Sequence, residues 1–315
     1  MLVPACTWVT NVAPIMQLGL EPVFCDVELS TFSFDLTHMK QLREIHGDEI
    51  RAVFVTHLLG LNANVEAFKE LFPRAIFMED ICESHGVTDE RGVKRGAGSS
   101  VGATFSFYYG HHMTTVEGGM VSTDDAELYE LMRLKRSHGM ARELSTSAAF
   151  ASACVQHPAI DPRFLFLTDG YNFRNTDLGA QLGLTQLERL STSVRIRQEN
   201  HAAFVQVLQR YDTHFYIPSA APTNSSFCLP FICKTRALYL VLKVAMEVAG
   251  IETRPVVGGN LLRQPFLKDH AHVHTANADL LNEQGFYIGN NQFVTAEQVR
   301  ALQPIIQECV DNVHG

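Results

Sequence analysis

The stretch Thr104-Phe-Ser-Phe-Tyr-Tyr-Gly-His111-His112-Met-Thr-Thr-Val-Glu-Gly118-Gly119 decides how the rest of the chain is interpreted. Its first half alternates small, polar and aromatic residues, which predicts a short strand over residues 103–108. A turn punctuated by glycine follows, and then a second strand over residues 120–123. Both histidines therefore stand where a strand ends, a position from which side chains reach a pocket.

The composition sets the broad class of protein. The chain has 315 residues, of which 46% are apolar and 19% charged, and its formal net charge is −9. This is the balance of a globular protein, and the negative charge disfavours nucleic acid as a partner, because phosphate binding needs a basic surface. No apolar run approaches the roughly 20 residues that span a bilayer, and the N-terminus lacks the layout of a signal peptide. We therefore expect a cytoplasmic protein with no membrane or nucleic-acid partner.

The seven cysteines, at positions 6, 25, 82, 154, 228, 233 and 309, are widely scattered. Their number is odd and several fall in apolar stretches, so we expect reduced core thiols rather than a disulfide framework. The sequence has no Cys-x-Cys or Cys-x-x-Cys, which weakens the case for an iron–sulfur cluster. No metal site is predicted.

Short apolar runs alternate with helical or polar stretches through the first half of the chain. The runs cover residues 2–6, 22–27, 52–56 and 75–79. Such alternation predicts an α/β fold, a mostly parallel sheet with helices on both faces. Ligands of these sheets bind beyond the carboxyl ends of the strands. Trp8, His57 and Asp80 each stand at or just beyond such an end, so we expect them to share a cleft with His111.

A long helix is predicted after residue 175, capped by Thr176 or Asp177 and ending near Arg210. An apolar strand over residues 227–233 and a helix over 237–248 follow, with further short elements after them. We therefore divide the chain into a large domain, residues 1–195, and a smaller α+β domain, residues 196–315.

The opening stretch resembles the cofactor-lysine segment of the DegT/StrS-type sugar aminotransferases, which are fold-type I enzymes dependent on pyridoxal phosphate (PLP). In that pattern an aromatic-Ser-aromatic strand leads through a short turn to Lys-Asn and then to Glu-Gly-Gly. His111 stands in the place of the lysine and His112 in that of the asparagine. The resemblance covers essentially the whole chain, and residues 90–100 resemble the hairpin before the active-site strand. It begins in mid-domain, so we expect the large domain to be N-terminally incomplete.

The histidine changes the expected chemistry, because only a primary amine can hold PLP covalently. The seven lysines of the chain all lie outside the opening stretch. An imidazole can still move protons near neutral pH, since its unperturbed pKa is about 6.5. We therefore expect non-covalent PLP, or its pyridoxamine form (PMP), with His111 facing it as the catalytic proton shuttle and His112 facing the turn or a partner chain. An isolated His-His pair would more often be two exposed turn residues.

Further matches imply which residues hold the cofactor. Asp80, in Phe77-Met-Glu-Asp80, stands where the family's aspartate pairs with the pyridine nitrogen, although an isolated aspartate at a strand end would more often cap a helix. Glu83 would lie near the ring hydroxyl, and Ser106 would bind the phosphate. Trp8 would lie against the ring, or else pack in the core. Asn172 would reach the partner's cofactor phosphate, which implies a homodimer with shared sites.

The same matches imply which residues contact the substrate. They are His138, Arg142, Arg174, Arg254, Asn260 and His57. For His138 and Arg142 a solvated surface position is an equal alternative.

The His-for-Lys subgroup of this family removes the C3 hydroxyl of a nucleotide-linked 4-keto-6-deoxyhexose, with glutamate as the amino donor. The resemblance thus implies a lyase of deoxysugar and O-antigen lipopolysaccharide biosynthesis that acts on GDP-4-keto-6-deoxymannose. One alternative is an aminotransferase-like protein, and another is a CDP-4-keto-6-deoxyglucose 3-dehydratase-like enzyme, which needs an iron–sulfur cluster on grouped cysteines. A third is a non-catalytic partner subunit, because the family's phosphate-gripping turn before the first strand is missing from the sequence.

Overall fold

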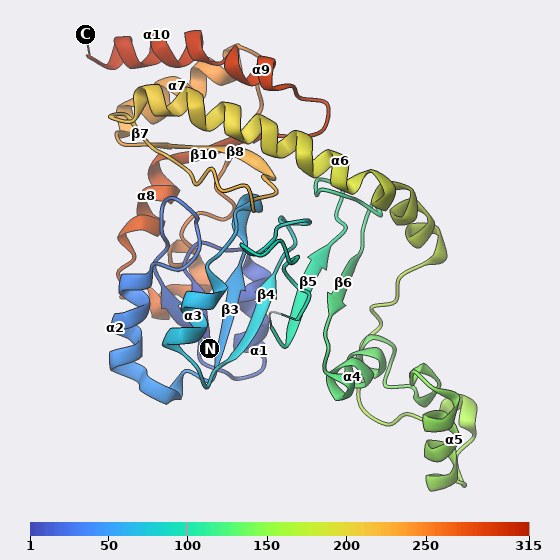
Figure 1. Ribbon diagram of the computed structural model, residues 1–315. Helices are drawn as coiled ribbons and strands as arrows, with labels where there is room; N and C mark the ends of the chain where they lie inside the picture. Colours follow the sequence, from blue (N-terminus) through green and yellow to red (C-terminus); the bar gives the residue numbers. More distant parts are fainter. Residues whose placement is uncertain (99, 315) are drawn as a thin grey trace.

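The computed structural model describes residues 1–98 and 100–314; Ser99, in the predicted hairpin, lies outside them. Over these residues the larger sheet has the strand order β2-β1-β3-β4-β5-β6 (Figure 1). Neighbouring strands are parallel except for the antiparallel pair β5 and β6. The strands are β1 (Leu2–Pro4), β2 (Val23–Cys25), β3 (Ala52–Thr56), β4 (Ile76–Asp80), β5 (Gly102–Ser106) and β6 (Gly119–Ser122). The mostly parallel α/β sheet predicted from the alternation is therefore confirmed.

Helices flank this sheet, and polar side chains begin several of them. Asp35, Asn64 and Asp125 each accept a backbone hydrogen bond at the start of a helix, which satisfies a donor that the first turn leaves free. The helices α4 and α5 belong to an arm that extends away from the sheet (Figure 1). The helices of this half are α1 (Ala13–Gln17), α2 (Leu36–His46), α3 (Val65–Leu71), α4 (Ala126–Arg136) and α5 (Ser147–Gln156).

The long helix α6 (Asp177–Leu208) joins the two halves of the molecule and spans 32 residues (Figure 1). The Thr176 hydroxyl caps it by accepting a hydrogen bond from the backbone N–H of Gly179 at 3.2 Å, as predicted. The second half of α6 contributes buried side chains such as Phe204, whereas Leu178 and other leucines of its first half are exposed. The predicted domain division at residue 195 falls inside this helix and stays a prediction.

The second sheet is antiparallel, and over the described residues its strand order is β7-β8-β10-β9. Apolar side chains of this sheet, α6 and α7 form one core, in which the rings of Phe231 and Phe286 stack at 5.0 Å. This part confirms the predicted smaller α+β unit. Its elements are β7 (Phe215–Tyr216), β8 (Cys228–Cys233), α7 (Arg236–Val248), β9 (Thr253–Pro255), α8 (Ala276–Gln284), β10 (Gly285–Gly289), α9 (Ala296–Arg300) and α10 (Gln303–His314).

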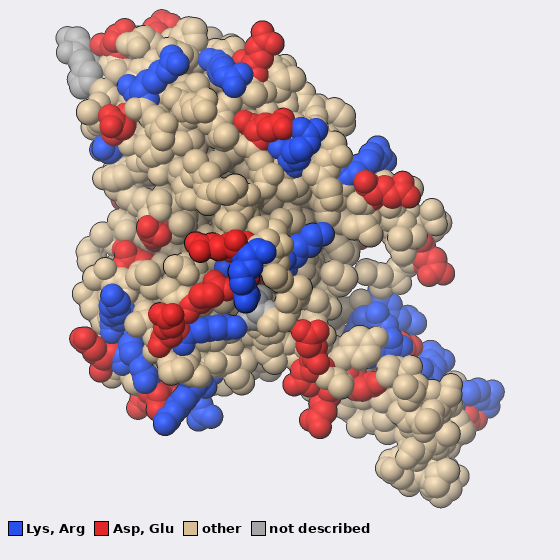
Figure 2. Space-filling view, viewed as in Figure 1, with Lys and Arg blue, Asp and Glu red and all other residues tan. Residues whose placement is uncertain are grey.

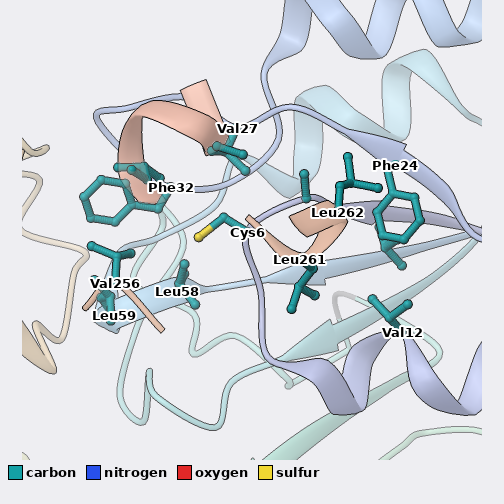
Figure 3. Packing of buried hydrophobic residues seen from close by; sticks show 14 of the residues in the cluster. Cys6, Val12, Phe24, Val27, Phe32, Leu58, Leu59, Val256, Leu261 and Leu262 are labelled. Carbon is teal, nitrogen blue, oxygen red and sulfur yellow. The ribbon is translucent and has the colours of Figure 1, made fainter. Parts of the chain in front are cut away.

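The two halves share a hydrophobic core (Figure 3). In it Val256, Leu261 and Leu262 from the C-terminal half pack in one cluster with Cys6 and Leu58 from the parallel-sheet half. All of these side chains are buried. The small C-terminal unit is therefore seated on the carboxyl ends of β1 and β3.

A close backbone contact fixes a second junction. Gly60 has φ +82°, and a Cβ there would stand 2.3 Å from the backbone nitrogen of Phe227. The Phe227 N–H donates to the carbonyl of Leu59 at 2.9 Å, and the Ser225 N–H donates to that of Gly60 at 2.8 Å. Only glycine accommodates this approach without strain. The junction carries the segment 225–227 onto the loop that follows β3.

Charged side chains of both signs are interspersed on the face of the molecule shown in Figure 2. None of the described helices is long and apolar enough to cross a bilayer.

Candidate active site

Asp80, the last residue of β4, is held at the carboxyl edge of the parallel sheet. Its Oδ2 accepts a hydrogen bond from Asn11 Nδ2 at 2.7 Å, and its Oδ1 accepts one from the backbone N–H of Cys82 at 2.9 Å. The side chain is buried. No helix begins at Asp80 in the described chain, which excludes the helix-cap alternative. Each carboxylate oxygen has further lone pairs, so Asp80 can still accept a bond from a ligand.

Asn11 is a site residue that sequence reasoning missed. Besides the bond to Asp80, its amide nitrogen lies within hydrogen-bond distance of Thr7 Oγ1 at 2.8 Å and Thr56 Oγ1 at 3.1 Å. These partners come from the loop after β1 and from the end of β3. No sequence motif marks Asn11, because its importance depends on a partner 69 residues away.

Glu83 lies in the turn beyond β4 with its carboxylate directed at the loop after β3. Its Oε2 accepts a hydrogen bond from the backbone N–H of Leu59 at 3.0 Å. Burial, together with the negative charge of Asp80, raises the pKa of Glu83 to about 7, against the opposing effect of the Leu59 bond. Glu83 therefore changes protonation state near neutral pH, unlike an ordinary surface glutamate.

His111 lies on the turn after β5, where its backbone N–H donates a hydrogen bond to the carbonyl of Tyr108 at 3.1 Å. Its ring lies edge-on to Tyr108 and Phe227, at centroid distances of 5.7 and 5.6 Å. Burial lowers the pKa of His111, while a hydrogen bond to the Ser106 backbone and the charge of Asp80 oppose this effect. The imidazole is therefore neutral at neutral pH, the state in which it can take up a proton.

His112 does not face the turn or a partner chain, and that prediction was wrong. The side chain is buried, and its Nε2 bonds to the carbonyl of Ser225 at 3.2 Å. A carbonyl can only accept, so this nitrogen carries the proton. His112 thus ties the β5–β6 turn to the C-terminal half of its own chain.

Ser106 and Trp8 occupy the same sheet edge. The Ser106 hydroxyl, at the end of β5, accepts a hydrogen bond from the Tyr108 N–H at 3.2 Å and keeps its own proton for a ligand. Trp8 follows β1 and is 55% exposed, which excludes core packing. Parallel strands end at one edge of the sheet, so Ser106 and Trp8 lie at the same edge as Asp80.

The structure removes two residues from the predicted substrate set. The His57 ring is buried and uses both nitrogens inside the protein, with Nε2 2.8 Å from Glu79 Oε2 and Nδ1 accepting from the Ala63 N–H at 3.1 Å. Successive strand residues point to opposite faces, so Glu79 draws His57 away from the face of Asp80.

Asn260 is likewise occupied. Its amide nitrogen donates to Thr275 Oγ1 at 3.0 Å and Asp279 Oδ1 at 2.7 Å, and its oxygen caps the turn at Leu262. Asn260 therefore has a structural role, and the predicted substrate contact is corrected.

Arg254, on β9, stays a candidate for substrate contact. Its side chain is exposed and pairs with Glu252 at 2.8 Å. A hydrogen bond to Glu252, together with the charges of Glu252, Tyr287 and Tyr108, raises the pKa of Arg254.

The other predicted substrate residues, and Asn172, lie on the arm. Asn172 pairs with Ser137 in an isolated β-bridge, and its Oδ1 accepts a hydrogen bond from Arg174 Nε at 3.0 Å. His138, with φ +61°, donates its N–H to the Tyr171 carbonyl at 2.7 Å. Arg142 is exposed. Within the described part of the chain, no hydrogen bond or ion pair joins these four side chains to Asp80 or His111.

The described residues bring no group of three His, Cys, Asp or Glu side chains together as a metal site. What they do assemble is a buried carboxylate, a hydroxyl and an imidazole at one edge of a parallel sheet. A carboxylate there suits a protonated pyridine nitrogen, and a serine hydroxyl with backbone amides suits a phosphate. The fold and this donor set define a fold-type I PLP-dependent enzyme.

The chain belongs to the DegT/DnrJ/EryC1/StrS aminotransferase family, whose model matches residues 1–307. It is similar to the GDP-4-keto-6-deoxy-D-mannose 3-dehydratase of Yersinia pseudotuberculosis, with 32% identity over 98% of this chain and 78% of the relative. The dehydratase of the same name from Escherichia coli O55:H7 is 29% identical over 97% of this chain and 79% of the relative.

Solved structures agree with this assignment. The Escherichia coli GDP-4-keto-6-deoxy-D-mannose-3-dehydratase with bound hydrated PLP superposes with a TM-score of 0.85 and 27% identity, covering 97% of this chain and 79% of that one. A variant of a GDP-4-keto-6-deoxymannose-3-dehydratase with bound GDP-perosamine gives a TM-score of 0.85 at 28% identity, covering 97% of this chain and 79% of that one. The aminotransferase from Psychrobacter cryohalolentis, 20% identical with a TM-score of 0.83, shares the fold.

Proposed function

We propose that this protein is a 3-dehydratase that uses PLP and PMP to remove the C3 hydroxyl of a nucleotide-linked 4-keto-6-deoxyhexose. The observation that carries the proposal is the imidazole of His111 on the turn after β5, where a lysine amine would bind PLP covalently. The dehydratases to which the chain is similar support GDP-4-keto-6-deoxymannose as the substrate. We place the reaction in the cytoplasm, in deoxysugar and O-antigen biosynthesis.

The cofactor would be held by side chains that the sheet edge positions. Asp80 would accept a hydrogen bond from the pyridine nitrogen, Ser106 would donate to the phosphate, and Trp8 would cover one face of the ring. Glu83 would stand at the ring hydroxyl, where its pKa of about 7 suits a shared proton. When bound, the PLP ring supplies the electron sink for the reaction.

His111 would handle the proton. With its pKa lowered by burial, the neutral ring would take at Nε2 the proton released from the carbon that bears the cofactor's amino group, and would deliver it to the departing C3 hydroxyl, which leaves as water. A lysine amine at this place could instead complete an amino transfer, so the imidazole favours deoxygenation. Glutamate would regenerate the amino form of the cofactor, and a relative trapped with a PLP-glutamate adduct supports that donor.

A homodimer would complete the site. The first half of α6 and the arm expose apolar side chains that a single copy leaves uncovered, among them Leu178 at 81% and Phe173 at 69%. Contiguous exposed apolar surface of this kind marks an interface. Because Asn172 and Arg174 lie on the same arm, docking two copies through it would bring these polar groups to the partner's cofactor and substrate.

The proposal is tested by incubating the protein with PLP, glutamate and GDP-4-keto-6-deoxymannose, and analysing the products by mass spectrometry. The expected sugar is one oxygen atom lighter than the substrate, and ammonia is released with it. An aminated sugar would overturn the proposal in favour of amino transfer. Iron above trace levels in protein purified without oxygen would favour the iron–sulfur alternative, and bound PLP without any turnover would favour the non-catalytic one.

A further inference from the structure

Six buried side-chain atoms beneath the His111 turn have no hydrogen-bond partner among the described residues. Four of the five residues that carry them are strongly buried: His85 is 3% exposed, Arg197 4%, His112 7% and Ser225 0%, while His111 is partly buried. Buried polar atoms of native proteins almost always find a partner, so a cluster of unpartnered ones needs an explanation. The atoms are both ring nitrogens of His85, Nδ1 of His111, Nδ1 of His112, Nε of Arg197 and Oγ of Ser225.

The side chains that carry these atoms gather around Phe227. The His85 and His112 rings lie 5.7 Å apart between centroids, and the His112 and His111 rings lie 6.0 and 5.6 Å from that of Phe227. Arg197 reaches the same residue from α6, since its Nη1 donates to the Phe227 carbonyl at 2.8 Å. We call this group of five residues, His85, His112, Arg197, Ser225 and Phe227, the histidine chamber.

The chamber offers donors and acceptors in a complementary mixture. Arg197 Nε can only donate, whereas His112 Nδ1 can only accept, because the other nitrogen of His112 donates to the Ser225 carbonyl. Burial, the charge of His111 and that of Arg197 lower the pKa of His85 to about 4, so its neutral ring offers one donor and one acceptor. Ordered water is the occupant that satisfies such a mixture, since each molecule both donates and accepts.

The chamber bears on catalysis because Nδ1 of His111 is itself buried without a partner, and the His111 ring lies 5.6 Å from the Phe227 ring of the chamber. To take a proton at Nε2, the resting imidazole must carry its single proton on Nδ1, and an acceptor on the inner side holds it there. The Ser106 backbone is a competing hydrogen-bond partner of the same ring. An inner acceptor is therefore needed to keep Nε2 free.

We propose that ordered water in the histidine chamber joins His85 to Nδ1 of His111, and that His85 is thereby the positioning residue that keeps the proton of the catalytic imidazole on Nδ1. This inference rests on the proposed function for the role of His111. Its central claim, the position of one proton, is measured without turnover.

Three variants test the proposal. His85→Phe fills the same volume without ring nitrogens, and His85→Gln restores a hydrogen-bonding group. His201→Phe is the matched control, because His201 is also a buried histidine with an unpartnered Nδ1 and lies on α6, bonded to the Ser219 carbonyl outside the chamber.

The first measurement is the ¹⁵N chemical shift of the His111 ring in PLP-loaded protein without substrate, assigned with His111→Asn. We expect the Nδ1–H form in the wild type, the His201→Phe variant and the His85→Gln variant, and a shift toward the Nε2–H form in His85→Phe. The same Nδ1–H signal in His85→Phe would overturn the proposal. If the wild type formed no dehydrated product, the proposed function would be wrong, but the ¹⁵N measurement of the His111 tautomer would still stand.

The second measurement is the pH profile of kcat/KM for the dehydration. The charged and titratable groups around His111 are Asp80, Tyr108, His112, His85 and Arg197. Losing the acceptor at Nδ1 destabilises the imidazolium, so in His85→Phe the acid limb should move to lower pH and kcat should fall about tenfold or more, with KM unchanged. His85→Gln should restore both the acid limb and kcat. A fall in kcat of His85→Phe without a shift of the acid limb would contradict the proposal, and so would an equal fall in kcat of His201→Phe.

Discussion

Asn11 Nδ2 donates a 2.7 Å hydrogen bond to Oδ2 of Asp80, the carboxylate that ends β4. The same amide lies between two threonine hydroxyls at the ends of neighbouring chain segments, Thr7 and Thr56. Hydrogen bonds to a carboxylate oxygen hold the rotamer of that side chain. Asn11 therefore orients the group proposed to pair with the pyridine nitrogen.

Replacing Asn11 with leucine should weaken PLP binding. Loss of one hydrogen bond to a charged group costs about 1.5–3 kcal/mol, which corresponds to roughly a 10- to 100-fold rise in Kd. Trp8, the single tryptophan, lies at the site and reports binding through its fluorescence. Asn64→Ala, which removes the cap of α3, is the control for a general loss of stability. An unchanged Kd in Asn11→Leu would show that Asp80 is held by other means.

His111 and His112 should separate function from stability. His111→Asn should lower kcat by roughly 10² to 10⁴, the usual cost of removing a general base, while cofactor binding persists. His112→Asn should mainly lower the Tm, because the ring anchors the turn to the Ser225 carbonyl. His111→Lys should retain PLP through desalting, owing to a covalent bond that mass spectrometry detects after reduction. A larger loss of kcat in His112→Asn than in His111→Asn would reverse the two roles.

Glu83 should make the stability of the protein depend on pH. Its folded pKa of about 7 lies above the unfolded value of about 4.3, so between these values the folded state binds more protons than the unfolded one. The contribution of Glu83 to the free energy of unfolding therefore falls as the pH rises between these two pKa values. Glu83→Gln should be no more stable than wild type at pH 4 and more stable at pH 8, measured as Tm. A Tm difference that is constant over this range would refute the raised pKa.

Two inactive variants should complement each other if the site is shared. Mixed dimers of His111→Asn and Asn172→Ala chains would contain one intact site, built from His111 of one chain and Asn172 of the other. Random exchange of subunits should therefore restore about a quarter of wild-type activity. The control is each variant carried through the same exchange alone. A mixture as inactive as its components would place Asn172 outside the partner's site.

Gly60 should tolerate alanine far less well than Gly92. Both have a positive φ, +82° and +81°, so both substitutions carry the left-handed backbone cost of roughly 1–2 kcal/mol. Only at Gly60 would the new Cβ meet backbone, 2.3 Å from the Phe227 nitrogen, whereas Gly92 has open space. Denaturant unfolding should give a larger loss for Gly60→Ala. Equal losses of unfolding free energy in the two variants would mean that the segment 225–227 can move aside without destabilising the fold.

Local patterns in the sequence determined the elements and their order. Short apolar runs separated by helical or polar stretches predicted the parallel strands, and Thr176 predicted the start of α6, because both signals depend on residues close together in the chain. The turn after β5 was equally readable, since Gly110 and the aromatic-Ser-aromatic strand before it are local signals. These features brought His111, Ser106 and Asp80 to one edge of the sheet.

Only the tertiary structure decided which polar side chains are available to a ligand. A residue type sets what a group can donate or accept, but its hydrogen-bond partners come from distant segments. Examples are the bonds of His57 with Glu79, of Asn260 with Asp279 and of Asn11 with Asp80. The burial of His85 and His112 beside Phe227 likewise depends on how the C-terminal half docks on the sheet. Hydrogen bonding and desolvation are set by packing across long sequence separations, which no local pattern encodes.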